Sequence, residues 1–293
     1  MLGPFFHHTA MSIPDVDSFS ASAAKPERFM RLVQSHYFTA PKHPVTPVTR
    51  ADLCLVHDKD YVDAVFSGIE PNGFGNHDPR VPEAALWTVG SLTSALLFAN
   101  KTHLPVCSPT SGFHHAGYAH GGGYCTFNGL MVAAAKYLQQ HPYHVVGILD
   151  LDMHYGDGTA DILKRKAIMN YRIVHHSAGE FFYDGGHRLE FFAWLNGAIN
   201  DLNQHGCNVV LYQAGADMHI NDPLGGLLDD GDMAKRDREV FRGIHAGIAW
   251  NLAGGYRGSD SIYTDKTLAS HLATVGEANA SDAIRKSRIR VAA

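Results

Sequence analysis

Two short apolar runs in this sequence end in acidic residues, and this feature most constrains how the chain folds. Residues 145–149 are followed by Asp150 and Asp152, and residues 209–212 are followed by Asp217. Apolar runs of this length are typical of buried strands. Because an unpaired charge is costly to bury, these carboxylates are expected to be paired, or to bind a cation, where each strand ends.

Other segments alternate between strand and helix patterns. Residues 104–107 and 171–174 have the composition of shorter strands, whereas residues 85–96 and 129–140 show helical spacing of apolar residues. This alternation predicts an α/β fold with a mostly parallel central sheet and helices on both faces. With 293 residues, 45% of them hydrophobic, the chain is expected to form a single catalytic domain over residues 1–293.

Two further expectations concern the segments around these elements. Apolar residues repeat every four positions from Val240 to Leu252, which predicts another helix. The polar stretches 14–26 and 72–82 are expected to be surface loops.

Composition and charge exclude several classes of function. The formal net charge is −5, so the chain is not expected to bind nucleic acid or an anionic membrane. The four cysteines form no CxxC pair, which indicates a reducing compartment. We find neither a signal peptide nor an apolar run long enough to span a bilayer, and therefore expect a cytoplasmic protein. The sequence leaves association into a homo-oligomer open.

The string DLDMHYGDG at 150–158 is the strongest candidate for a metal site. In an extended segment every second side chain lies on the same face, so Asp152 and His154 are well placed to bind one cation. A third ligand is needed, and Asp217 is our choice; Asp222 is the competitor, although its place before a proline favours a turn. Such an oxygen-rich set suits Zn²⁺ by default, with Fe²⁺, Mn²⁺ and Co²⁺ as alternatives.

A pair of histidines, His114 and His115, lies between a predicted strand and the glycine-rich run GGGYC at 121–125. Two carboxylates, Asp150 and Asp157, are free to pair with them. A carboxylate on one imidazole nitrogen raises the basicity of the other, as a general base requires. Cys125 as a nucleophile is the alternative, but it would leave the acidic strand ends unexplained.

A tyrosine follows two glycines in LAGGY at 252–256. Tyr256 could offer its hydroxyl to a developing oxyanion. The alternative is a glycine that ends a helix, with Tyr256 packed on the surface.

Taken together, these pieces resemble the zinc-dependent histone deacetylase family of the arginase–deacetylase superfamily, which includes acetylpolyamine amidohydrolases and acetoin-utilisation proteins. The resemblance runs from about Lys25 to His271. Its motifs are KPER at 25–28, LVHDKDYV at 55–62, SGFHHAG at 111–117, GGGYCTFN at 121–128, DLDMHYGDGT at 150–159, QAGAD at 213–217 with DPLG at 222–225, LAGGY at 252–256 and TLASH at 267–271.

The resemblance implies a role for each matching position. Asp152, His154 and Asp217 are implied to be metal ligands, and His114 and His115 the paired histidines supported by Asp150 and Asp157. Tyr256 is implied to polarise the acyl carbonyl. The implied substrate-binding residues are Gly123, Tyr124, Phe181, Phe182 and, as a loop acid that grips substrate amides, Asp78. A K⁺ site is also a property of the family, but the segment Ile173–Ser177 departs from the family pattern and argues against it here.

The function expected from this resemblance is metal-dependent hydrolysis of an N-acylated amine such as acetyl-lysine or an acetylpolyamine. His115 would serve as general base and acid, with Tyr256 stabilising the oxyanion. One alternative is an arginase-like ureohydrolase with two metal ions, which needs further carboxylates; Gly156 stands where one is typical. The other is a protein that binds acylated amines without hydrolysing them.

Overall fold

A computed structural model describes residues 3–37, 40–166, 171–183 and 187–292, with side chains as far as residue 283. Its centre is a seven-stranded sheet in the order β2-β1-β3-β7-β6-β4-β5, and every pairing is parallel. The strands are β1 (Phe5–Phe6), β2 (Lys42–His43), β3 (Pro105–Ser108), β4 (Val146–Asp150), β5 (Ile173–Ser177), β6 (Val209–Gln213) and β7 (Gly247–Asn251).

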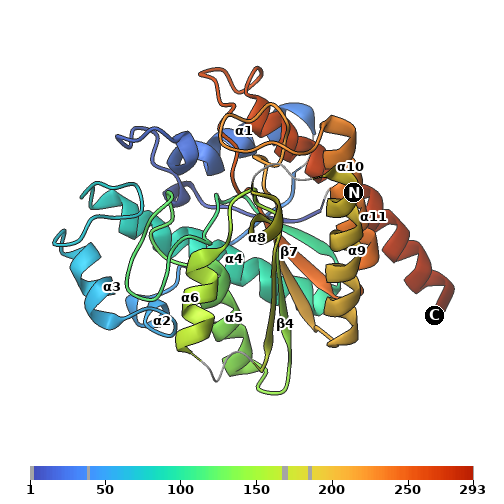
Figure 1. The fold of residues 1–293 in the computed structure, drawn as a ribbon, viewed down its shortest axis with the longest axis horizontal. Coiled ribbons are helices and arrows are strands. Elements are labelled where there is room, and N and C mark those ends of the chain that lie inside the picture. The colour runs from blue at the N-terminus through green and yellow to red at the C-terminus, as the bar shows by residue number, and fades with distance from the viewer. Residues whose placement is uncertain (1–2, 38–39, 167–170, 184–186, 293) are drawn as a thin grey trace.

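Helices cover both faces of this sheet. Figure 1 shows α5 and α6 on one side of the strands and α9 on the other. The helices are α1 (Lys25–His36), α2 (Arg50–Leu53), α3 (Lys59–Phe66), α4 (Arg80–Thr102), α5 (Gly129–Gln140), α6 (Asp157–Arg165), α8 (Gly179–Phe182), α9 (Arg188–Gln204), α10 (Asp230–Gly243) and α11 (Lys266–Ala292), with short 3₁₀ turns at Thr9–Met11 and Ala21–Ala24.

The side chains of each central strand alternate between two hydrophobic cores. In β6, Val209 and Leu211 join the core under α4 and α5, whereas Val210 and Tyr212 join the core under α9, α10 and α11. Successive side chains of a strand point to opposite faces, so a strand that is apolar at every position is buried on both. This explains why the central strands β4 and β6 are apolar runs up to their polar last residues. The predicted α/β fold is therefore confirmed.

The register of the strands brings their polar ends together. Asp150 of β4 pairs with Gln213 of β6 on one side and with Ser177 of β5 on the other, and Gln213 pairs with Asn251 of β7. All four are the last residues of their strands, and the loops that follow carry the predicted site.

The four predicted strands and the helices at 85–96 and 129–140 are confirmed, but the helix from Val240 to Leu252 is wrong. Its first part is the end of α10 and its second part is β7. Ile248 lies in the core of the sheet, and Val240 packs in the same cluster from the helix. A helix and a strand that both bury apolar residues in one core produced a spacing that imitates a single longer helix.

The stretch 14–26 is also more ordered than predicted. It contains the 3₁₀ turn Ala21–Ala24 and the first residues of α1, and Lys25 is only 5% exposed. A lysine is almost never buried without polar partners, so this one has a structural or functional role.

The helix α4 is the one element in the described residues that is long and apolar enough to cross a membrane by length and composition. By this criterion α4 is long enough to span a bilayer, contrary to the expectation from the sequence. Half of that segment is buried inside the protein, and α4 packs against α5, β3 and β7. A core helix passes the same test as a membrane span, so this is weak evidence for a membrane.

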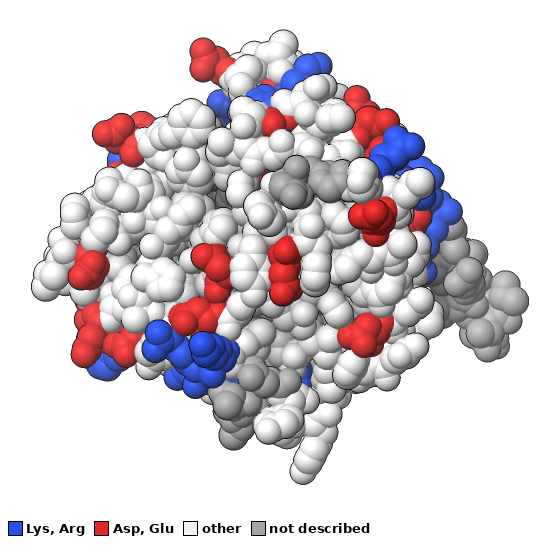
Figure 2. Space-filling view, viewed as in Figure 1, with Lys and Arg blue, Asp and Glu red and all other residues white. Residues whose placement is uncertain are grey.

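The surface in Figure 2 agrees with the acidic formal charge. On the face shown, acidic side chains are dispersed and basic side chains form small separate groups rather than one broad basic surface.

Candidate active site

Asp152, His154 and Asp217 converge just beyond the ends of β4 and β6. The Nδ1 atom of His154 lies 3.0 Å from Asp152 Oδ1 and 3.0 Å from Asp217 Oδ2. Their ligand atoms all lie within 4.8 Å of one another, and they form the one such group of three among the described residues. Both aspartates are buried, and His154 is partly buried. Gly179 of α8 packs directly on the backbone of His154, where a Cβ would clash.

The charges of this cluster fit a divalent cation. Burial raises the pKa of Asp217, and the neighbouring charge of Asp152 raises it further. Hydrogen bonds to Asp152 and Asp217 raise the pKa of His154 to about 11. The protonated imidazole thus supplies the positive charge that two buried carboxylates require. A bound cation would supply the same charge and leave His154 neutral, as a ligand must be.

His114 forms the more buried of two histidine–aspartate pairs. Its Nδ1–H donates to Asp150 Oδ2 at 2.7 Å. Asp150 also accepts from the Gln213 side chain and the Asp152 amide, so its position is fully determined. Burial lowers the pKa of His114, but Asp150 and Asp152 outweigh that effect and raise it to about 9.

His115 forms the second and more exposed pair. Its Nδ1–H donates to Asp157 Oδ1 at 2.7 Å, which leaves Nε2 free. Burial is the largest single effect and opposes ionisation of Asp157, but the hydrogen bond and charge of His115 together with the Gly158 amide outweigh it and hold the pKa of Asp157 below the usual range. The His115 ring lies 4.1 Å from that of His114 and 6.0 Å from that of His154. A Cβ at Gly123 would clash with the His115 ring, so the glycine-rich loop packs directly on this histidine.

Tyr256 lies across the cluster from the two histidines, in the turn that follows β7 rather than beyond a helix. Its ring centroid is 6.4 Å from that of His154 and 5.9 Å from that of Tyr124. Burial and the charges of Asp152 and Asp217 raise its pKa, so its hydroxyl stays protonated and able to donate.

A narrow cavity of about 20 Å³ borders this cluster, and its lining includes His114, Gly123, Tyr124, Asp152 and Tyr256. Cys125 also lines it, but burial raises the pKa of this thiol to about 12. A thiol that is protonated at neutral pH is a poor nucleophile, which weighs against the cysteine alternative.

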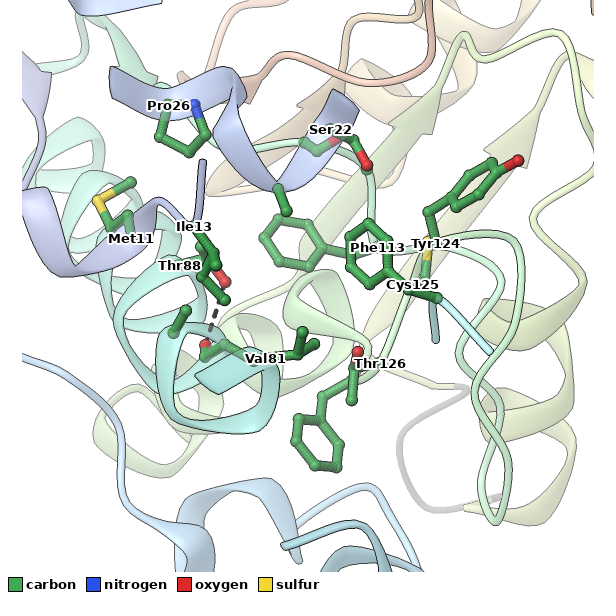
Figure 3. Close-up of a pocket in the computed structure, with 17 residues that line it drawn as sticks. Met11, Ile13, Ser22, Pro26, Val81, Thr88, Phe113, Tyr124, Cys125 and Thr126 are labelled. Carbon is green, nitrogen blue, oxygen red and sulfur yellow. Dashed lines mark hydrogen bonds between the residues drawn. The ribbon is translucent and has the colours of Figure 1, made fainter. Parts of the chain in front are cut away.

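An apolar cavity of about 70 Å³ adjoins this pocket and shares five lining residues with it. Figure 3 shows Ile13 and Val81 on one side of this cavity and Tyr124 and Cys125 on the other. The pocket is thus polar around the acid–imidazole cluster and borders apolar surface elsewhere.

Three of the five residues predicted to bind the substrate do not line either cavity. Phe182 packs in the core with Phe191, and Phe181 beside it is 56% exposed. Asp78 lies just before α4, where it accepts from the Arg80 amide and pairs with the Arg80 side chain. The structure therefore does not bring these three to the other site residues.

Sequence reasoning missed two residues that the structure brings to the site. Lys25 lines the pocket, and its Nζ donates to the carbonyl oxygens of Leu252 and Gly254 at 3.0 and 2.6 Å. Asp222, considered only as a ligand or a turn residue, does form a turn by accepting from the Leu224 amide, and it also accepts from the Tyr256 amide. The KPER motif contains Lys25 but gives no sign of its burial.

The parallel sheet, with an acid–imidazole cluster and two histidine–aspartate pairs beyond its carboxyl edge, defines the arginase–deacetylase class. The chain belongs to the histone deacetylase family, since the model described as "Histone deacetylase domain" matches residues 21–191, more than half of the sequence. Membership assigns the chain to the hydrolases of acylated amines.

Two relatives show how far the sequence similarity extends. An uncharacterized protein from Picosynechococcus sp. is 29% identical over 244 residues, which are 75% of this chain and 80% of that protein. The acetoin utilization protein AcuC from Staphylococcus aureus is 32% identical over 171 residues, which are 52% of this chain. The match spans only 43% of AcuC, so less than half of that protein is represented.

Two solved structures share the fold. The acetylpolyamine aminohydrolase from Burkholderia pseudomallei has a TM-score of 0.71, with 95% of this chain and 99% of that chain covered. The HD domain of HDA15 has a TM-score of 0.74, with 94% and 87% covered. Both are 18% identical to this chain, a level at which the likeness supports the fold alone.

Proposed function

We propose that this protein hydrolyses the amide bond of an N-acetylated amine, such as acetyl-lysine or an acetylpolyamine. One divalent cation, Zn²⁺ by default, would be held by Asp152, His154 and Asp217. The observation that carries the proposal is the close grouping of these three residues with two histidine–aspartate pairs, next to a narrow pocket that Asp152, His114 and Tyr256 line.

A cation at this place would supply Lewis acidity, which polarises the acyl carbonyl and lowers the pKa of an attacking water. His115 then takes the proton of that water on Nε2, because its Nδ1 is occupied by Asp157. The same nitrogen returns the proton to the departing amine. His114 is buried and its Nδ1–H donates to Asp150, and its ring contributes to the electrostatic potential of the pocket.

Tyr256 donates its hydroxyl hydrogen to the carbonyl oxygen as negative charge develops there. Its raised pKa supports this role, since a phenolate could not donate. Tyr124, whose ring faces that of Tyr256, would border the substrate's aliphatic stem.

Two descriptions support acylated amines of both kinds as substrates. The family model is described as a histone deacetylase domain, and the Burkholderia protein is an acetylpolyamine aminohydrolase. A direct comparison of an acetyl-lysine peptide with acetylputrescine and acetylspermidine would separate the two substrate classes. Cytoplasmic location also stays a prediction, as does the argument against a K⁺ site.

The proposal is tested by a deacetylation assay on protein that has been treated with a chelator and then titrated with Zn²⁺. We expect turnover to be absent after chelation and to return with one equivalent of metal per chain. A requirement for two equivalents would favour the ureohydrolase alternative. Tight binding of an acetylated amine without turnover would favour the binding-protein alternative.

A further inference from the structure

Tyr256 lies in a segment without regular secondary structure, residues 252–257, which we call the tyrosine loop. Several distant parts of the chain hold its backbone. The Leu252 amide donates to Thr110 O, the Ala216 amide donates to Ala253 O, and the Arg257 amide donates to Thr267 Oγ1. Lys25 holds the carbonyls of Leu252 and Gly254, as described above.

Two glycines interrupt these contacts just before the tyrosine. Gly254 and Gly255 have φ values of 50° and 89°, a backbone region that residues with a side chain rarely adopt. Because glycine adopts many other conformations as well, contacts upstream of this pair do not determine where Tyr256 points. A contact to Tyr256 itself is needed.

Asp222 makes that contact. Its Oδ2 accepts from the Tyr256 amide at 2.8 Å, and its Oδ1 accepts from the Leu224 amide at 3.1 Å. The residue is 5% exposed, so water does not replace these bonds easily. Each carboxylate oxygen thus has one backbone donor.

The turn that contains Asp222 is itself attached to the metal-site segment. The Asp222 amide donates to His219 O, and a Cβ at Gly225 would clash with the backbone oxygen of Asp217. Asp222 therefore connects the tyrosine to the chain segment that carries Asp217.

We infer that Asp222 is a positioning residue, which holds the Tyr256 amide so that the phenol faces the carbonyl oxygen of bound substrate. The inference rests on the proposed function, in which Tyr256 is the oxyanion donor. It assigns Asp222 a role in the rate of the chemical step and none in binding the metal or the substrate.

The test is a cycle of Asp222→Asn, Tyr256→Phe and the double variant, with kcat and KM measured on an acetyl-lysine substrate. An asparagine has one acceptor oxygen, so it leaves one of the two amides facing an NH₂ group. We expect Asp222→Asn to lower kcat by about tenfold to a hundredfold, the range for a small displacement of a reacting group, with little change in KM. The double variant should be no slower than Tyr256→Phe alone, because Asp222 acts through the tyrosine hydroxyl.

Two outcomes would overturn the inference. One is an unchanged kcat in Asp222→Asn, and the other is a double variant whose loss is the product of the two single losses, as a merely structural role predicts. If Tyr256→Phe alone has no effect, the proposed function has the wrong oxyanion donor, which is a separate failure.

Control variants keep the test informative. The matched control is Asp52→Asn, at the start of α2 and away from the pocket. The Asp52 carboxylate also accepts from a backbone amide, that of Thr49, and its substitution should leave kcat unchanged. Asp222→Glu keeps two acceptor oxygens, so it should have a higher kcat than Asp222→Asn. It also keeps the inference testable if Asp222→Asn folds poorly. Metal content and thermal unfolding are measured for every variant, and Asp222→Asn should retain one equivalent of metal.

Discussion

At the scale of single residues, the pocket depends on which groups keep their protons. Burial keeps Tyr256 and Cys125 protonated, so one is a donor and the other a weak nucleophile. His115 differs from both, because its Nδ1 is bonded to an exposed carboxylate and its Nε2 is free. Of the two paired histidines, His114 has its Nε2 3.7 Å from Asp152 Oδ1, whereas no such carboxylate contact is found for the Nε2 of His115 among the described residues.

The tyrosine hydroxyl gives the first prediction. Tyr256→Phe should lower kcat by about 10²–10³, the range for loss of one oxyanion donor. The substitution removes a single oxygen that makes no hydrogen bond required for folding, so the unfolding temperature should change little. Steady-state kinetics measure the change in kcat, and a thermal melt measures the change in unfolding temperature. A kcat within threefold of the parent would mean that another group donates to the oxyanion.

His57 gives a prediction about acid stability. Its Nδ1–H donates to Gly117 O, and its Nε2 accepts from the Asn128 amide. A second proton, on Nε2, would face the Asn128 N–H, which is itself a donor. Burial already lowers the pKa of His57 to about 4 from 6.5. Between these values the unfolded chain binds a proton that the folded chain does not, so the free energy of unfolding decreases as the pH falls from 6.5 to 4. The loss from this residue is of the order of 3 kcal/mol.

Urea unfolding at several pH values measures this effect. His57→Gln keeps one donor and one acceptor but cannot be protonated, so its stability should decrease less steeply between pH 6.5 and 4.5 than that of the parent. Equal slopes in the two proteins would show that His57 does not contribute.

At the scale of elements, patterns within one strand or helix were predictable, and boundaries between packed elements were not. The strands β4 and β6 are apolar up to their polar last residues because both of their faces are buried, and that property is visible in the sequence. The end of α10 and the strand β7 were merged into one helix, because both send residues into the same core. The two elements can be told apart only from the tertiary structure.

The tyrosine loop gives a prediction at this scale. A Cβ at Gly254 would clash with the carboxyl group of Asp217, and the φ of 50° is unfavourable for alanine. Gly254→Ala should therefore weaken metal binding as well as lower turnover. Gly122→Ala is the matched control, because nothing lies within 4 Å of its Cβ position. Metal affinity from a competition titration measures the difference, and equal affinities in both variants would contradict it.

At the scale of the whole molecule, the sheet gathers residues that are far apart in the sequence. Asp152 and Asp217 could be predicted as partners, because strands of a parallel sheet end at the same edge. Lys25 could not, since its burial depends on carbonyl groups of the tyrosine loop. Phe181 and Phe182 were placed at the substrate by resemblance alone, and the path of the chain after β5 puts one in the core and leaves the other exposed.

The buried acidic pair gives the last prediction. Without a cation, the buried Asp152 and Asp217 depend on protonated side chains such as His154 and His114 for positive charge, so a divalent metal should stabilise the folded state. At a metal concentration of 100 times Kd the gain is about 2.7 kcal/mol. Zn²⁺ should therefore raise the unfolding temperature of chelator-treated protein. Asp217→Asn should abolish this increase in unfolding temperature. The control Asp60→Asn, at an exposed position on α3, should retain it. An increase that survives in Asp217→Asn would place the metal elsewhere.

The bonds from Lys25 to the tyrosine loop join positions 227 and 229 residues apart. During synthesis, the helix that begins at Lys25 leaves the ribosome long before its carbonyl partners are translated. A nascent chain that ends before Leu252 therefore lacks both of these partners, and one that ends before Tyr256 also lacks the phenol. Under the proposed function, deacetylation is expected only after the residues up to Tyr256 have been released to fold.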